Sequence, residues 1–123
     1  MASHTPVVCR HFHQAIELIG RRWTGAILRV LMGGRMRYCT IRGAIPEVSD
    51  RMLSERLKEL ETEGIVLRLV TPDTPVRVEY ELTKKGRALE QALAAVEQWA
   101  EEWKNAPAAA PARAQPRARA IRS

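Results

Sequence analysis

Apolar side chains recur at helical spacing through the first 64 residues and predict four helices, at residues 12–19, 24–32, 38–44 and 49–63. The predicted helices stop at residues that end helices or cannot continue them: Gly20, Gly33, Pro46 and Gly64. Two hydroxyl side chains, Thr24 and Ser49, stand where an oxygen can cap the second and the fourth helix.

The apolar period changes to two between residues 65 and 82. The stretches IVLRLVT and VRVEYEL each alternate, the second with a polar outer face, and the Pro-Asp-Thr-Pro between them is a turn sequence. They predict an antiparallel hairpin, which must pack on the helices because an isolated hairpin is marginally stable in water. A last helix is expected from Thr83 to about Asn105, with an apolar stripe made of Leu89, Ala92, Leu93, Val96, Trp99, Ala100 and Trp103.

This order of elements predicts a mainly α protein with a small antiparallel β-hairpin, the layout of a winged helix-turn-helix. We expect one such domain over residues 1–105, since a chain of 123 residues makes one compact domain the default. Residues 106–123 are almost all Ala, Pro and Arg, with four arginines and no acid. Such a segment cannot bury enough apolar surface to offset its ordering entropy, so we expect a disordered basic tail.

The tail carries most of the net charge of +6 and leaves +2 for the domain. It is expected to be either a solvated segment or a basic arm that binds nucleic acid or an acidic surface. No apolar run approaches the roughly 20 residues that span a bilayer, and the N-terminus is too polar for a signal peptide. The two cysteines indicate reduced thiols rather than a disulfide framework, so we expect a cytoplasmic protein with no membrane partner.

The polar face of the predicted helix at residues 49–63 is the strongest functional signal. The second helix of a helix-turn-helix enters the major groove, where Arg51 can bond guanine bidentately and Ser54 can bond several bases. Glu55 can accept from a cytosine amine or orient a neighbouring arginine, and Lys58 suits phosphate. The alternative is a solvated amphipathic helix, but two arginines of the hairpin favour DNA. The candidate DNA-binding residues are Ser49, Arg51, Met52, Ser54, Glu55, Lys58, Arg68 and Arg77.

Three segments resemble the HxlR family of bacterial transcriptional regulators, relatives of the MarR-type winged helices. They are the Gly-Arg-Arg-Trp turn at residues 20–23, the run RMLSERLKEL at 51–60 and the strand PVRVEY at 75–80. The resemblance extends over roughly residues 9–103. It implies a homodimer that binds double-stranded operator DNA, which we expect to act as a repressor. It also implies a recognition helix at 49–63, a wing at 65–82 and dimerisation through the first and last helices.

The last helix supports a dimer independently, because a stripe with two tryptophans is more apolar than a small domain needs on one surface helix. The alternative is that Trp99 and Trp103 cover the core of the monomer. A two-fold dimer would set two recognition helices about 34–36 Å apart and so match a near-palindromic site. The candidate interface residues are Phe12, Ile16, Leu93, Val96, Trp99 and Trp103.

Cys9 is the candidate sensor of oxidants or electrophiles. It stands beside Arg10 at the start of the first helix, and a helix N-terminus with nearby cations favours the thiolate, the reactive form. Several members of the resembled family sense such signals with a cysteine at this position, although many have proline next. The alternative is a structural or incidental thiol. For Cys39 the sequence offers no physical reason to expect reactivity. We expect no zinc site in CRHFH, since ligands two residues apart lie on opposite helix faces and a fourth is lacking.

Enzyme signals are absent from the sequence: it has no glycine-rich phosphate loop and no nucleophile–base pair, so we expect neither catalysis nor a cofactor. Two other functions stay open. One is a winged-helix module that binds protein, although such a face more often carries exposed aromatic residues than arginine and lysine. The other is a regulator that responds to a small molecule bound at the dimer interface near Trp23, Trp99 and Trp103.

Overall fold

The structure, a computed structural model, describes residues 7–104. Its elements are α1 (Arg10–Ile19), α2 (Thr24–Leu31), β1 (Met36–Arg37), α3 (Tyr38–Ala44), α4 (Asp50–Thr62), β2 (Val66–Thr71), β3 (Arg77–Leu82), α5 (Lys84–Arg87) and α6 (Glu90–Trp103). The chain divides into two units, Met1–Leu93 and Ala94–Ser123. The tail predicted at residues 106–123 lies outside the described residues.

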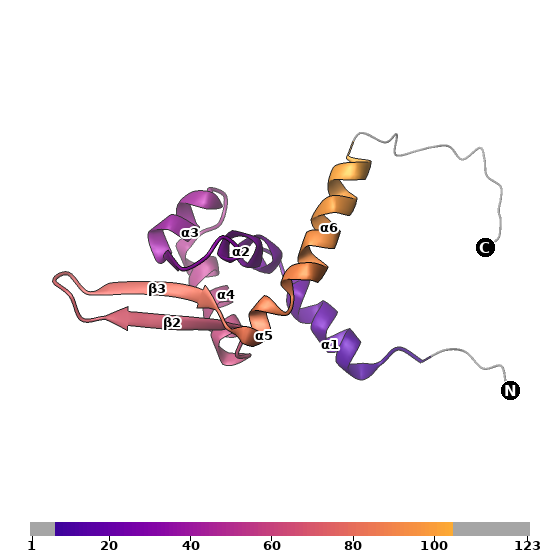
Figure 1. Cartoon of the computed structure of the whole chain (residues 1–123), viewed down its shortest axis with the longest axis horizontal. Coiled ribbons are helices and arrows are strands. Elements are labelled where there is room, and N and C mark those ends of the chain that lie inside the picture. The colour runs from indigo at the N-terminus through magenta and orange to yellow at the C-terminus, as the bar shows by residue number, and fades with distance from the viewer. Residues whose placement is uncertain (1–6, 105–123) are drawn as a thin grey trace, which may run out of the picture. The chain divides into compact units, whose positions relative to one another are not determined.

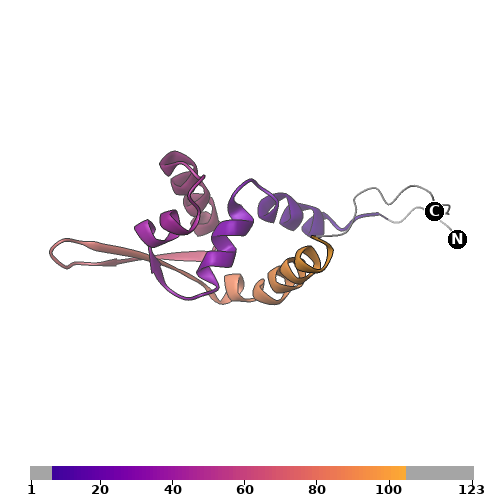
Figure 2. The ribbon, with the colours of Figure 1, turned by 90° about the horizontal axis from the view of Figure 1, so that it is seen from above.

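The first unit holds the predicted helices and hairpin. In Figure 1 and Figure 2, the hairpin of β2 and β3 projects beyond the helices as a wing, with α3 and α4 near its base. The core lies between the helices and the base of this hairpin and consists of Ile27, Leu28, Leu31, Ile41, Ile45, Val48, Leu53, Leu57, Leu60, Ile65, Val66, Tyr80 and Leu82. One core therefore supports both α4 and the wing.

Helix α4 forms as its sequence predicts. Ser49 is its N-cap, and the Ser49 hydroxyl accepts a hydrogen bond from the Met52 backbone N–H at 3.1 Å, which satisfies one of the orphan donors of the first turn. The helix is followed by Gly64 at φ +74°, a left-handed conformation that glycine adopts without steric cost. Its three leucines, at positions 53, 57 and 60, are almost completely buried.

The start of α2 differs from the prediction. Thr24 is not the N-cap but the first helical residue, and the N-cap is Trp23, a bulky residue at φ +77°. The Thr24 hydroxyl is buried and has no hydrogen-bond partner among the described residues. The prediction was wrong because the Gly-Arg-Arg-Trp turn holds Trp23 in a conformation that local propensity disfavours for a bulky residue.

The sheet has three strands rather than two, in the order β1-β3-β2. Strand β1 pairs antiparallel with β3 and places Met36 opposite Tyr80 and Arg37 opposite Glu79. A strand of two residues is too short to show a period, so hydrophobic patterning could not predict it. It ties the entrance of α3 to the middle of the wing.

The register of the hairpin decides which side of β2 faces the helices. Val66 pairs with Leu82, Arg68 with Tyr80 and Val70 with Val78, so these residues share one face of the sheet. Because Val66, Tyr80 and Leu82 belong to the core, this is the face that carries the helices. Leu67 and Leu69 lie on the opposite face, which apolar alternation alone could not determine.

The expected single helix after the wing is interrupted. Thr83 caps the four-residue α5, and its hydroxyl accepts from the Gly86 N–H at 3.1 Å. The Leu89 N–H then bonds the Gly86 carbonyl, a tightened turn that separates α5 from α6. A side chain at Gly86 would meet the Ile65 carbonyl at 2.3 Å, so glycine allows α5 to lie against the start of β2.

The second unit begins within α6. Among its described residues, Val96, Trp99 and Trp103 are 62%, 64% and 58% exposed. Leu93, the last residue of the first unit, is half-buried and packs against the core cluster. Leu89 of the predicted apolar stripe lies before α6, whereas the other residues of the stripe lie on α6, with a large exposed area on the two tryptophans.

Candidate nucleic-acid interface

The outward face of α4 carries four exposed polar side chains: Arg51, Ser54, Glu55 and Lys58. At 100° per residue these positions lie within about one quarter of the helix circumference, opposite the three buried leucines. Met52 lies on a flank instead, where it is half-buried and packs against the core. Ser49 serves as the cap. The face predicted to meet DNA is thus formed by four of the six candidates in this segment.

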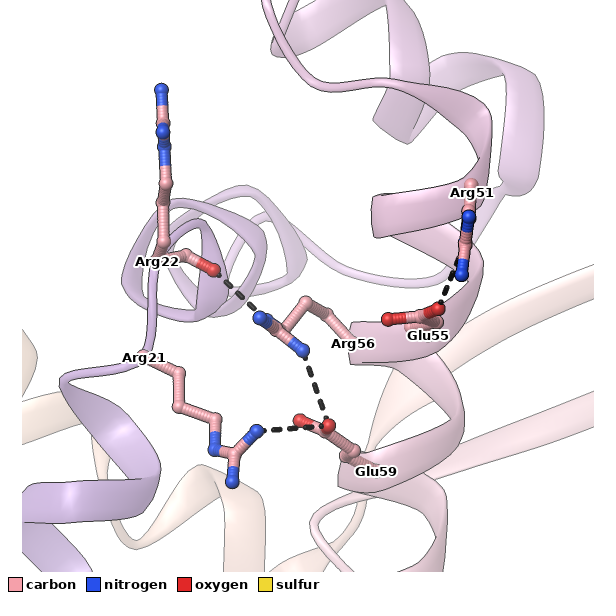
Figure 3. Close-up of polar contacts among 6 residues, drawn as sticks. All are labelled: Arg21, Arg22, Arg51, Glu55, Arg56 and Glu59. Carbon is pink, nitrogen blue, oxygen red and sulfur yellow. Dashed lines mark hydrogen bonds and ion pairs between the residues drawn. The ribbon is translucent and has the colours of Figure 1, made fainter.

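Arg51 is held by its neighbour one turn along α4. The Arg51 side chain is 88% exposed, and its Nε lies 3.2 Å from the Glu55 Oε2 (Figure 3). This geometry matches one of the two roles expected for Glu55, the orientation of a neighbouring arginine. The pair is exposed and therefore contributes little to stability, so its main effect is on where the guanidinium points.

Lys58 differs from Arg51 in its surroundings. Its ammonium makes no hydrogen bond or ion pair with any residue between 7 and 104, and its side chain is exposed. An exposed lysine is suited to phosphate, where it acts as a point charge without a fixed geometry.

The two wing arginines lie on opposite faces of the hairpin. Arg68 pairs with Tyr80 on the face that carries the helices, whereas Arg77 pairs with Thr71 on the other face. The Arg77 Nη2 also lies 2.7 Å from the Asp73 Oδ2 at the turn. Arg68 has no ion pair with another residue of the described part of the chain. Of the two, Arg68 is therefore the one placed on the α4 side with its charge uncompensated.

Helix α3 holds the N-terminal end of α4. The Tyr38 hydroxyl lies 3.1 Å from both the Asp50 carbonyl oxygen and the Asp50 Oδ1, and 3.3 Å from the Ser54 Oγ. The Arg42 Nε lies 3.1 Å from the same Asp50 Oδ1. Tyr38 and Arg42 were not among the residues predicted from the sequence, because residues 8 to 16 positions apart show no joint signal before the fold brings the two helices together.

The turn between α1 and α2 holds the other flank of α4, as Figure 3 shows. Arg56 donates from Nε to the Arg22 carbonyl at 3.0 Å and from Nη1 to the Glu59 Oε2 at 3.1 Å. Arg21 reaches the same Glu59 oxygen at 3.1 Å. The Arg22 guanidinium carbon lies 4.9 Å from the centroid of the Trp23 ring, over which it stacks. Trp23 is the residue whose backbone is left-handed. Both flanks of α4 are therefore bonded to other helices, and its polar face is left open.

Helix α1 has a different character. None of its residues is buried, and Phe12 and Ile16 are 60% and 51% exposed on one side of the helix. Cys9 stands at its N-cap position, and both Cys9 and Cys39 are free, exposed thiols. No group of three metal-ligating side chains occurs in the part of the chain that the structure describes. Within the same residues, no helix has the length and apolar character needed to cross a bilayer.

The sequence matches the family model of the HxlR-like helix-turn-helix over residues 18–108. Two relatives from Bacillus subtilis (strain 168) are the uncharacterised HTH-type transcriptional regulator YvaP and the HTH-type transcriptional regulator YodB. They are 48% and 46% identical to this chain over 96 residues, which cover 78% of it and 89% and 86% of the relatives. The chain belongs to the HxlR-like family. The predicted fold, a winged helix-turn-helix, and the predicted function, DNA-binding transcriptional regulation, are confirmed at this level.

Solved structures of relatives give the same fold. The reduced form of YodB superposes with a TM-score of 0.73 at 44% identity and covers 82% of this chain and 99% of that one. YodB has also been solved in a diamide-treated form and a quinone-bound form. The redox regulator HypR in its oxidised form superposes with a TM-score of 0.72 at 35% identity, covering 75% and 95% of the two chains. Cys9 precedes the segment matched by the family model.

Proposed function

We propose that this HxlR-like regulator binds a near-palindromic operator as a homodimer, reads bases with the polar face of α4 and contacts the phosphate backbone with Lys58 and the wing. The observation that carries the proposal is the exposed face formed by Arg51, Ser54, Glu55 and Lys58 on a helix whose two flanks are bonded to other elements. A rigidly held helix can present its side chains to base edges in one orientation, which sequence discrimination requires. A cytoplasmic location and a role without catalysis or cofactor accord with such a function.

The homodimer is proposed from uncovered apolar surface. Phe12 and Ile16 on α1, and Val96, Trp99 and Trp103 on α6, present large apolar side chains that are each more than half exposed in one chain. Tryptophan and phenylalanine contribute most to interface energy when a partner covers them. A two-fold axis would then pair two copies of α4 with successive major grooves, about 34–36 Å apart.

The signal is proposed to be an oxidant or electrophile that modifies Cys9. Support comes from the exposed thiol at the N-cap of α1 and from the relatives: YodB has diamide-treated and quinone-bound forms, and HypR is a redox regulator. Modification at the start of α1 would change the packing of a dimer built on this helix and thereby the spacing of the two reading helices. An intact Cys39 would not substitute for Cys9 in this response.

The DNA-binding proposal is tested with Arg51→Ala and a matched control, Arg87→Ala. Arg87 is the last residue of α5 and, like Arg51, pairs with a glutamate that follows it closely in sequence, Glu90 at 3.3 Å. Sites selected from random double-stranded DNA by the parent are compared with single-base variants of those sites. We expect Arg51→Ala to lose about 1–3 kcal/mol of discrimination at one position per half-site, and Arg87→Ala to behave as the parent. Equal behaviour of the two variants would refute reading by α4.

The Cys9 proposal has its own test. Cys9→Ser and Cys39→Ser are each treated with diamide, and operator binding and thiol mass are measured. We expect the parent and Cys39→Ser to lose operator affinity when treated with diamide. Cys9→Ser should bind the operator equally well before and after treatment. A Cys9→Ser protein that responds like the parent would point to a non-covalent ligand.

A specific observation favours a second candidate, a small-molecule effector. A groove of about 670 Å³ lies between α1, the end of α4 and α5, lined by residues that include His11, Leu18, Glu63, Lys85 and Leu89. Its size and its mixture of apolar and charged walls suit an organic ligand. The test is a thermal-shift screen of small organic compounds with the parent and with Leu89→Trp. A compound that binds the groove should stabilise the parent but not the variant, because the tryptophan would fill the groove.

A further inference from the structure

The Tyr38 hydroxyl has more potential acceptors than protons. It contacts the Asp50 carbonyl oxygen and the Asp50 Oδ1, each at 3.1 Å, and the Ser54 Oγ at 3.3 Å. A phenol has one proton to donate and lone pairs with which to accept. Both Asp50 oxygens can only accept, since one belongs to a carbonyl and the other to a carboxylate. The Tyr38 proton is therefore directed to Asp50.

This assignment determines the role of Ser54. If Ser54 did not donate to Tyr38, the two hydroxyl oxygens would face each other with lone pairs only, which is repulsive at 3.3 Å. The Ser54 hydroxyl is thus assigned as the donor to the Tyr38 oxygen, and it has no second proton to donate. What remains for a ligand outside is acceptor capacity alone.

The arrangement is held from several sides. The Asp50 carboxylate, one of the two acceptors offered to the Tyr38 hydroxyl, also forms an ion pair with the Arg42 Nε at 3.1 Å. Asp50 follows the capping residue Ser49 in the first turn of α4. Helix α3, which carries Tyr38 and Arg42, is anchored in the core by the fully buried Ile41. Ser54 itself is exposed, on the face of α4 that also carries Arg51 and Lys58.

We propose that Tyr38 is a specificity-determining residue: by accepting the hydrogen bond that the Ser54 hydroxyl donates, it leaves Ser54 only able to accept from DNA and so selects an adenine or cytosine where Ser54 meets a base. In the major groove only these two bases present a donor, the exocyclic amine, whereas guanine and thymine present acceptors at the corresponding positions. A serine hydroxyl without the Tyr38 contact could pair with either group of bases, because it can both donate and accept a hydrogen bond. The inference rests on the proposed function, in which α4 reads the major groove.

The test uses the full chain and a pool of double-stranded DNA with a randomised centre, selected by binding and sequenced. The variants are Tyr38→Phe, Ser54→Ala and the two combined, with Tyr80→Phe as the matched control. Tyr80 is a buried tyrosine of β3 for which no hydrogen bond with another described residue is observed, so Tyr80→Phe removes the same atom without removing a hydrogen bond to α4. Phenylalanine keeps the ring of Tyr38 and its packing.

We expect the parent to prefer adenine or cytosine by about fivefold at one position per half-site, the selectivity of one hydrogen bond. Ser54→Ala should remove this preference. Tyr38→Phe should reduce it at that position alone by admitting guanine and thymine, and should have no further effect when added to Ser54→Ala. Tyr80→Phe should give the profile of the parent.

Three results would overturn the inference: a preference for guanine or thymine at the position sensitive to Ser54→Ala, a Tyr38→Phe profile identical to the parent's, or a loss spread evenly over all positions. Arg51→Ala, included in the same selection, separates this failure from that of the proposed function. If Arg51→Ala changes the profile and Tyr38→Phe does not, only the role of Tyr38 is wrong. If neither Arg51→Ala nor Ser54→Ala changes it, base reading by α4 is wrong.

Discussion

Helices α4 and α1 both belong to the first unit, but within a single chain only α4 has its apolar face buried. Three leucines of α4 are almost fully buried, and its flanks are bonded to α3 and to the α1–α2 turn. No residue of α1 is buried, and its Phe12 and Ile16 remain more than half exposed. An isolated helix of ten residues is marginal in water, so α1 needs a partner surface that α4 does not need.

The difference indicates how the two helices divide their tasks. A helix that is bonded on both flanks can hold side chains in the geometry that base recognition demands. A helix whose apolar face is uncovered gains its stability from association, and its position can change when that association changes.

The largest effect is expected from Leu57→Ala in α4. Leu57 is 1% exposed in the centre of the core, so truncation removes its buried contacts and leaves a cavity. We expect a loss of about 2–5 kcal/mol in the free energy of unfolding, measured by urea titration followed by far-UV circular dichroism. A loss below 1 kcal/mol would mean that α4 is not fixed by the core in the way its burial suggests.

Ile16→Glu tests the other side, the uncovered face of α1. A glutamate placed in a dimer interface would be buried without a partner, so we expect the dimer dissociation constant to rise by about 100-fold or more. Gln14→Glu is the matched control, since it adds the same charge on the opposite side of α1 and should leave the dimer intact. Sedimentation across protein concentrations makes the measurement; a dimeric Ile16→Glu protein would place the interface elsewhere.

Arg56→Ala is expected to have an intermediate effect. It removes the donor to the Arg22 carbonyl and the partner of Glu59 at a side chain that is only 13% exposed. Hydrogen bonds to charged groups contribute about 1.5–3 kcal/mol, so we expect a loss of that size in unfolding free energy. DNA affinity should fall as well, because α4 loses one of its two flanking supports. Arg51→Ala, on the open face, serves as the control and should leave stability within about 0.5 kcal/mol of the parent.

The smallest effect concerns the wing. Arg68→Ala should weaken binding to all DNA sequences nearly equally. It should also reduce the slope of log affinity against log salt concentration by about one unit, the value for one phosphate contact. Arg77→Ala should change the slope less, because Arg77 lies on the opposite face of the hairpin and is bonded to Asp73. Affinities measured between low and moderate salt distinguish the two; equal slopes for both variants would contradict the proposed side of contact.

Hydrophobic patterning predicted the order of elements well, and the reason is local. The leucines of α4, the cap at Ser49 and the glycine after the helix each act within one or two turns, so the sequence alone located this helix. The alternation in β3 likewise predicted its inward residues Tyr80 and Leu82. It did not predict β1 or the break after α5, because both depend on contacts with residues distant in sequence, such as Tyr80 and Ile65.

The candidate site likewise combines features that the sequence determines with features that depend on the tertiary structure. The sequence by itself determined that α4 has a polar face with Arg51, Ser54, Glu55 and Lys58, since helical spacing places them together whatever surrounds the helix. Only the tertiary structure decided that Arg68 and Arg77 lie on opposite faces of the wing, and that the Tyr38 hydroxyl lies within 3.3 Å of the Ser54 Oγ. Strand register and the crossing of α3 with α4 are set by core packing between distant segments, and such packing leaves no periodic trace in the sequence.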